Sequence, residues 1–149
     1  MKRLMIGVAM AALAGCLAWN GSNEPKVAYV DAFDLANTSC GVGKRMLAQK
    51  SVDGNPLTVA GKTYAHGFGT HPESAVAFFA NGKVKAFDAL VGIDDDAKRA
   101  GSGKSYGKPA ASFFVWADGR IVWSAKDVTL GQKPIAVHVD LTGVKEVVL

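Results

Sequence analysis

Residues 64–74 read Tyr64-Ala65-His66-Gly67-Phe68-Gly69-Thr70-His71-Pro72-Glu73-Ser74, and further along residues 91–96 read Val91-Gly92-Ile93-Asp94-Asp95-Asp96. In this block two glycines flank an aromatic residue, two histidines flank the glycines, and an acidic triplet follows a strand-like run. Because only glycine adopts positive φ freely, Gly67 and Gly69 predict a tight backbone turn into the next strand. Unusual residues cluster nowhere else in the chain, so this block is the main guide to the fold.

Outward from the block, short strand-like runs follow one another. Asn81-Gly82 and Asp118-Gly119 each lie between two apolar runs, which is the strongest short signal for a hairpin. Residues 134–141 alternate apolar and polar side chains, as a half-buried strand does. No run after the N-terminal leader sustains a helical period, so we expect an all-β sandwich or barrel with a long polar loop at 94–109. The predicted strands are 27–30, 57–59, 74–80, 84–93, 111–116, 121–124, 134–141 and 145–149.

The N-terminus has the composition of an export leader. Lys2 and Arg3 precede an apolar run at 4–13 that is too short to cross a bilayer as a helix. The order Leu13-Ala14-Gly15-Cys16 resembles the lipobox of bacterial lipoproteins, in which the cysteine becomes the acylated first residue. We therefore expect a lipoprotein signal peptide at 1–15, lipidation of Cys16 and a tether at 16–26. The alternative is an ordinary secretory signal that is cut nearby.

These features predict an exported protein: a membrane-anchored lipoprotein of a bacterium, periplasmic or on the cell surface, or otherwise a secreted protein. Removal of Lys2 and Arg3 lowers the formal charge from +4 to +2. The remaining charges are dispersed, so nucleic acid is not an expected partner. Cys40 is then the only cysteine, which excludes an internal disulfide, and a buried, inert thiol is the favoured interpretation. Residues 27–149 have the length of one domain.

Five motifs follow one another in a fixed order: residues 54–64, 67–71, 87–95, 114–119 and 139–145. Together they resemble the NPCBM domain, the carbohydrate-binding module family fifty-one type, which is often attached to glycoside hydrolases such as α-galactosidases. The resemblance covers residues 27–149 and implies a galactose-binding-like jelly-roll β-sandwich. Members of this family usually continue past the last motif, so two alternatives stay open: 145–149 is a buried final strand, or the C-terminal strand of the fold is missing from this chain.

His71 is the first candidate for contact with a sugar. A neutral imidazole donates to one hydroxyl and accepts from another, which suits a vicinal pair; the alternative is a histidine that fixes the corner of the chain. His66 is a second candidate. Trp116 and Trp123 offer stacking platforms for a pyranose ring, with core or hairpin packing as the alternative because both lie in apolar strands.

Asp94 is the acidic candidate, because its carboxylate can accept hydrogen bonds from sugar hydroxyls. Asp94 and Asp95 also offer carboxylate oxygens to calcium, the one cofactor that the sequence indicates. The alternative is that the acidic triplet only begins a charged, solvated loop.

The function that the resemblance implies is a non-catalytic carbohydrate-binding module for galactose-type glycans, on a surface lipoprotein or beside a hydrolase domain beyond the chain end. The carboxylates form no recognisable catalytic pair, so an enzyme is not expected. The alternatives are a structural or protein-interaction sandwich that has lost sugar binding, and the N-terminal fragment of a glycoside hydrolase.

Overall fold

The computed structural model describes residues 8–11, 18–20, 22–32, 38–41, 46–101 and 109–149. Strands dominate these residues, and two 3-10 helices join them. The described elements are β1 (Val8–Ala11), β2 (Ala18–Asn20), β3 (Ser22–Lys26), η1 (Val30–Ala32), β4 (Leu47–Ala48), β5 (Leu57–Val59), β6 (Lys62–Tyr64), β7 (Phe68–Thr70), β8 (Ala77–Phe79), β9 (Ala86–Ile93), η3 (Asp95–Gly101), β10 (Ala110–Ala117), β11 (Arg120–Thr129), β12 (Ile135–Asp140) and β13 (Glu146–Val148).

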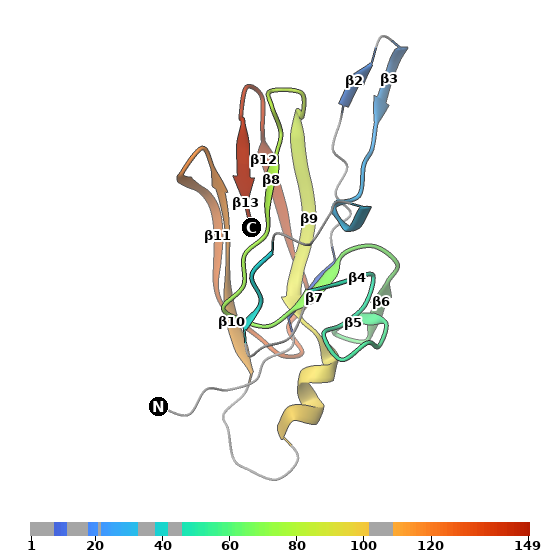
Figure 1. The fold of residues 1–149 in the computed structure, drawn as a ribbon. Helices are drawn as coiled ribbons and strands as arrows, with labels where there is room; N and C mark the ends of the chain where they lie inside the picture. The colour runs from blue at the N-terminus through green and yellow to red at the C-terminus, as the bar shows by residue number, and fades with distance from the viewer. Residues whose placement is uncertain (1–7, 12–17, 21, 33–37, 42–45, 102–108) are drawn as a thin grey trace.

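Two antiparallel sheets form the layers of a β-sandwich (Figure 1). One sheet has five strands in the order β12-β9-β1-β7-β4, and the other has four in the order β11-β10-β13-β8. The expected all-β sandwich is therefore confirmed. The core lies between the layers, where every second side chain of β9, β10 and β12 is buried. Its largest fully buried side chains include Phe68, Phe87, Ile93 and Leu141, while Leu57 and Val59 form a second, smaller cluster with Tyr64.

β1 comes from the predicted leader. It pairs with β7 on one side and with β9 on the other, so Ala9 lies between Gly69 and Gly92 in the register. The predicted tether likewise contains the β2–β3 hairpin, which forms a sheet of its own. Cys16 lies outside the described residues. None of the described helices is long and apolar enough to cross a membrane.

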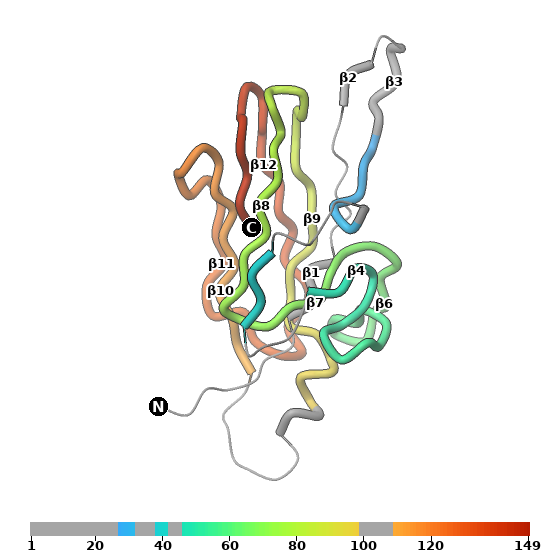
Figure 2. The backbone as a smooth tube through the Cα atoms, viewed as in Figure 1, coloured from blue at the N-terminus to red at the C-terminus, as the bar shows by residue number. Residues whose placement is uncertain are grey.

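The Asn81-Gly82 turn corrects one prediction. Both residues adopt positive φ, as the sequence indicates, but β8 and β9 do not pair with each other. β8 pairs with β13 in one sheet, and β9 pairs with β1 and β12 in the other. The turn therefore carries the chain from one layer to the other (Figure 2). Val144 and Lys145 hold it in place, because their carbonyls accept the amides of Gly82 and Asn81.

The second hairpin forms as predicted. Asp118 and Gly119 take positive φ between β10 and β11, as a two-residue turn that matches strand twist requires. β11 continues to Thr129, so residues 126–129, expected to be a loop, are strand. Conversely, residues 27–29 are not a strand, and the loop expected after Ile93 begins with the 3-10 helix η3.

The sequence did not predict β7, whose three residues are all buried. Gly67 has the expected positive φ of 128°, but Gly69 is needed for another reason. A Cβ on Gly69 would lie 2.6 Å from Cα of Ser51, and a Cβ on Gly92 would lie 2.6 Å from Cγ1 of Val59. The segment from Ser51 to Val59 thus packs directly onto the sheet where these two glycines lie.

Candidate functional site

The acidic triplet lies at the end of β9 and fastens the β5–β6 hairpin to the sheet. Asp94 is 1% exposed. Its Oδ2 accepts the Thr58 amide at 3.0 Å and its Oδ1 accepts the Asp96 amide at 2.8 Å. Burial raises the pKa of Asp94 above its ordinary value, and these two hydrogen bonds oppose the rise only in part. Asp94 is therefore not a solvated loop residue but a buried carboxylate that accepts two backbone amides, and its contact with a sugar stays a prediction.

The carboxylates of Asp95 and Asp96 also bind donor groups of the protein itself. Asp95 Oδ2 accepts the Gly61 amide at 2.8 Å, and its Oδ1 lies 3.0 Å from Nζ of Lys98. Asp96 Oδ2 accepts the Asn55 side-chain amide at 2.9 Å. No three His, Cys, Asp or Glu side chains converge on a metal position in the part of the chain that the structure describes. The predicted calcium ligands, Asp94 and Asp95, therefore do not fit a calcium site, which needs several free oxygens.

His71 is buried at the corner after β7, with 3% of its surface exposed. Its carbonyl accepts the Gly41 amide, and its own amide lies 3.4 Å from Sγ of Cys40. Thr70 Oγ1 also donates to that sulfur, at 3.2 Å. These contacts favour the alternative that His71 fixes the corner; contact with a sugar stays a prediction. Cys40 is a half-buried free thiol.

His66 lies at the surface in a fixed orientation. Its Nδ1 is 3.2 Å from Oδ2 of Asp31, which also accepts the Gly67 amide at 3.1 Å. The His66 side chain is 35% exposed, and that of Asp31 only 2%. Tyr29 stacks on the imidazole with ring centroids 3.6 Å apart and planes 6° from parallel. The sequence missed Tyr29 and Asp31, because nothing in it shows that a segment so distant reaches His66.

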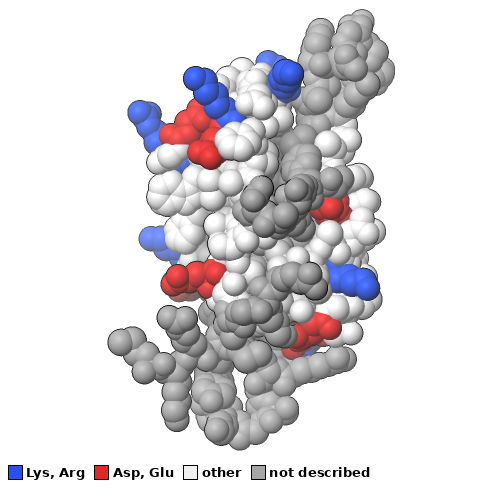
Figure 3. All heavy atoms as spheres, in the orientation of Figure 1, with Lys and Arg blue, Asp and Glu red and all other residues white. Residues whose placement is uncertain are grey.

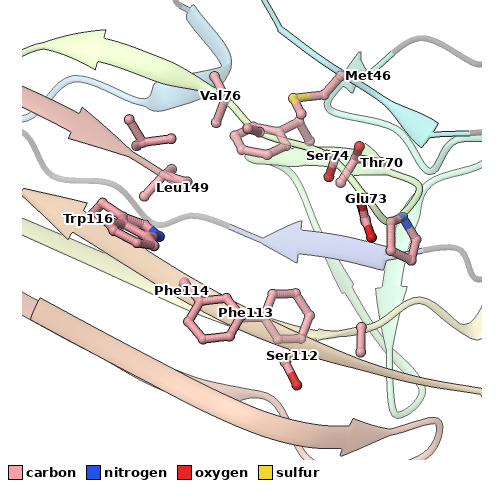
Figure 4. A pocket seen from close by; sticks show the side chains of 15 residues that line it. Met46, Thr70, Glu73, Ser74, Val76, Ser112, Phe113, Phe114, Trp116 and Leu149 are labelled. Atoms are coloured by element: carbon pink, nitrogen blue, oxygen red, sulfur yellow. The ribbon is translucent and has the colours of Figure 1, made fainter. Parts of the chain in front are cut away.

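Trp116 is 39% exposed and lines a pocket of about 280 Å³ at the end of β13. Figure 4 shows Ser112, Phe113, Phe114 and Trp116 of β10 along one wall. Residues 72–76, Val148, Leu149 and the buried side chains of Met46 and Phe68 also line the pocket. None of the other predicted site residues (His66, His71, Asp94 and Trp123) lines this strand-end pocket, although Thr70 and Pro72, the two neighbours of His71, do.

Trp123 is half-buried and packs against the core, which favours the packing alternative. His138 faces the solvent, with 73% of its side chain exposed, and its Nδ1 lies 2.6 Å from Oδ1 of Asp88 across the β9–β12 ladder. Basic and acidic side chains are interspersed on the face seen in Figure 3. That pattern agrees with the dispersed charge of the sequence.

Comparison with known proteins identifies the family. The NPCBM/NEW2 domain family matches residues 26–149. The chain belongs to the NPCBM/NEW2 family. A solved structure of a CBM51 module from Clostridium perfringens GH95, in complex with methyl-galactose, is 25% identical to this NPCBM chain with a TM-score of 0.68. The match covers 81% of this chain and 83% of that one. The expected jelly-roll architecture of the family is confirmed by this likeness.

Two curated relatives of this NPCBM chain are named as glycosidases. A putative endo-alpha-N-acetylgalactosaminidase of Renibacterium salmoninarum is 33% identical over 99 residues, which is 66% of this chain and 6% of the relative. Alpha-1,3-galactosidase B of Akkermansia muciniphila is 29% identical over 153 residues, 95% of this chain and 18% of the relative. The chain thus spans a small part of the length of either protein.

Proposed function

We propose that this NPCBM domain is a non-catalytic module that binds galactose-type glycans. The observation that carries the proposal is the likeness to the CBM51 module solved with methyl-galactose, which extends over most of both chains. The names of the two curated relatives, a galactosidase and an N-acetylgalactosaminidase, favour the same class of sugar. A module of this kind would keep an attached hydrolase domain close to its substrate.

We place the sugar contact at the His66 site, defined as His66, Tyr29 and Asp31. The Asp31 carboxylate accepts a hydrogen bond from Nδ1–H of His66. With the proton on Nδ1, the Nε2 lone pair of the ring is left as an acceptor for a sugar hydroxyl. Asp31 and the Tyr29 ring hold the imidazole in place before any ligand arrives, which lowers the entropy cost of binding. Among the five predicted sugar contacts, His66 alone combines an exposed polar ring with a buried orienting partner.

Calorimetric titration of the full chain with methyl-galactose tests this proposal. We expect saturable binding that weakens at least tenfold in His66→Ala. His138→Ala is the matched control, because it removes another exposed histidine that is held by an aspartate, and its affinity should not change. Absence of binding to any sugar on a glycan array would overturn the function. Binding that persists in His66→Ala but disappears in Trp116→Ala would overturn the site alone.

We also propose that the protein is exported and anchored through Cys16, as the order Leu13-Ala14-Gly15-Cys16 indicates. Cleavage before Cys16 would remove β1 and leave β7 and β9 without the strand that lies between them. Membrane fractionation with intact-mass measurement tests the anchor. We expect Cys16→Ala to move the protein from the membrane to the soluble fraction. An unacylated protein that keeps residues 1–15 would overturn the proposal.

A further inference from the structure

The carboxylate of Asp31 lies buried behind the exposed ring of His66. Asp31 belongs to the 3-10 helix η1, and its side chain is only 2% exposed. Its Oδ2 accepts the Gly67 amide at 3.1 Å and Nδ1–H of His66 at 3.2 Å, so both donors converge on one oxygen. Neither donor carries a charge while the imidazole is neutral. The carboxylate therefore keeps a full negative charge directly behind the ring.

Within the part of the chain that the structure describes, no lysine or arginine forms an ion pair with this carboxylate. The basic group that lies beside Asp31 is His66 itself. Lys62, the closest lysine to His66 in the sequence, lies instead over the Tyr64 ring, with Nζ 5.3 Å from the ring centroid. Tyr29, which stacks on the imidazole, is uncharged at neutral pH. The His66 site thus carries a negative charge that no described cation neutralises by direct contact.

This charge lies close to the place where a ligand would bind. A sugar oxygen that is hydrogen-bonded to Nε2 of His66 would be separated from the Asp31 carboxylate only by the ring and two hydrogen bonds. That separation is roughly one Debye length, about 8 Å, at physiological ionic strength. Because the carboxylate is buried, water and salt screen its charge less than they screen an exposed one. A ligand with an anionic group near this oxygen would be repelled, whereas a neutral sugar would not.

We propose that Asp31 makes the His66 site selective for neutral galactosides over acidic ones, such as galactosides that carry a sulfate. This inference rests on the proposed binding of galactose-type glycans at the His66 site, and it names the class of glycan within that function. One carboxylate then has two roles: its hydrogen bond orients the imidazole, and its charge disfavours an anionic ligand. Specificity arises in this way when a binding site places a like charge beside the wrong ligand.

Protonation of His66 should weaken this selectivity. The imidazolium offsets the charge of Asp31, and its Nε2 becomes a donor that suits a sulfate oxygen. The described side chains in contact with the imidazole are Tyr29 and Asp31, so His66 is the group of the site that we expect to change charge between about pH 8 and about pH 5. A sulfate ester stays ionised throughout this interval, so a change in its relative affinity would come from the protein.

Calorimetric titration of the full chain with methyl-galactose and with its 6-sulfate, which leaves the ring hydroxyls free, tests the proposal. We expect the sulfated sugar to bind at least about fivefold more weakly at neutral pH and physiological salt. This difference should narrow in high salt and again at about pH 5. Asp31→Asn keeps an oxygen for both donors but removes the charge, so it should reduce the difference to less than about twofold while methyl-galactose still binds. Asp88→Asn, which removes the carboxylate beside another exposed histidine, is the matched control and should leave the difference unchanged.

Equal affinities of the native sequence for the two sugars would overturn the selectivity and leave the proposed function standing. A difference that persists unchanged in Asp31→Asn would also overturn it, because shape rather than charge would then exclude the sulfate. If Asp31→Asn does not fold, the native sequence decides: a difference that depends on neither salt nor pH would overturn the proposal. Absence of methyl-galactose binding to the native sequence would overturn the proposed function and this inference together, so the two failures are distinguishable.

Discussion

The carboxylate of Asp94 accepts the backbone amide of Thr58 at 3.0 Å, across 36 positions of the chain. Through this bond the end of β9 holds β5. Asp94→Asn keeps the size of the side chain but supplies one acceptor oxygen where two amides, of Thr58 and Asp96, need acceptors. We expect a loss of about 1–3 kcal/mol in the free energy of unfolding at neutral pH, measured by urea denaturation. Asp88→Asn, on the exposed face of β9, is the control and should cost less than about 0.5 kcal/mol.

The raised pKa of Asp94 predicts in which direction its contribution to the free energy of unfolding changes with pH. Burial makes the native state hold this proton at a higher pH than the unfolded chain does. As pH rises from the ordinary value of 3.8 through the raised pKa, the unfolded state therefore loses its proton first, and the contribution of Asp94 to stability falls. The difference in unfolding free energy between the native sequence and Asp94→Asn should accordingly shrink over this interval. A difference that grows with pH would contradict the assignment of burial as the dominant cause.

Gly92 predicts a steric coupling. In Gly92→Ala the new Cβ would lie 2.6 Å from Cγ1 of Val59, so one of them has to move. We expect the substitution to cost about 1–3 kcal/mol. In the double variant Gly92→Ala/Val59→Ala the clash is absent. Its loss of unfolding free energy should therefore be smaller than the sum of the losses of the two single variants, by about 0.5–3 kcal/mol. Denaturant midpoints of the four proteins in this cycle give the coupling; strict additivity would mean that the segment relaxes away from the sheet.

Asp118 predicts a contrast between two substitutions. Its carboxylate accepts the amides of Lys145 and Glu146 at 3.1 and 3.0 Å, while its backbone has a φ of 46°. Asparagine tolerates this φ and keeps one acceptor, whereas alanine lacks both properties. Asp118→Ala should cost about 2 kcal/mol and Asp118→Asn clearly less. Thermal unfolding of both variants checks the order, and equal losses would show that neither the acceptor oxygen nor the tolerance of positive φ that asparagine keeps contributes to stability.

Local patterns predicted where β5 and β8 to β13 lie, but predicted poorly which strands pair with each other. The alternation at 134–141 and the Asp118-Gly119 turn depend on neighbouring residues only, and both agree with the structure. Asn81-Gly82 has the same local chemistry, yet its flanking strands pair elsewhere because β8 meets β13. β7 was missed because a three-residue strand that contains a glycine has little propensity of its own and depends on its packing.

In the candidate site, too, the sequence indicates single residues but not the distant segments that they contact. The residue types of His66 and Trp116 pointed to ligand contact, and both side chains are partly exposed. Their surroundings come from distant segments: Asp31 lies 35 positions from His66, and Leu149 meets Val76 at the end of the strand-end pocket. No spacing rule in one sequence encodes such contacts. The burial of Asp94 likewise depends on a distant segment, because Thr58 of the β5–β6 hairpin donates its amide to the Asp94 carboxylate.

The passage of the chain between layers at Asn81-Gly82 has a consequence for folding. Apart from the hairpins β2–β3, β5–β6 and β10–β11, the described strands pair with partners that are not their neighbours in sequence. Large loops must therefore close before most of the ladders form, which slows folding. Since consecutive strands β8 and β9 belong to opposite layers, neither layer can assemble as an independent unit. The sandwich should consequently unfold in a single cooperative step, with the same midpoint for probes placed in either sheet.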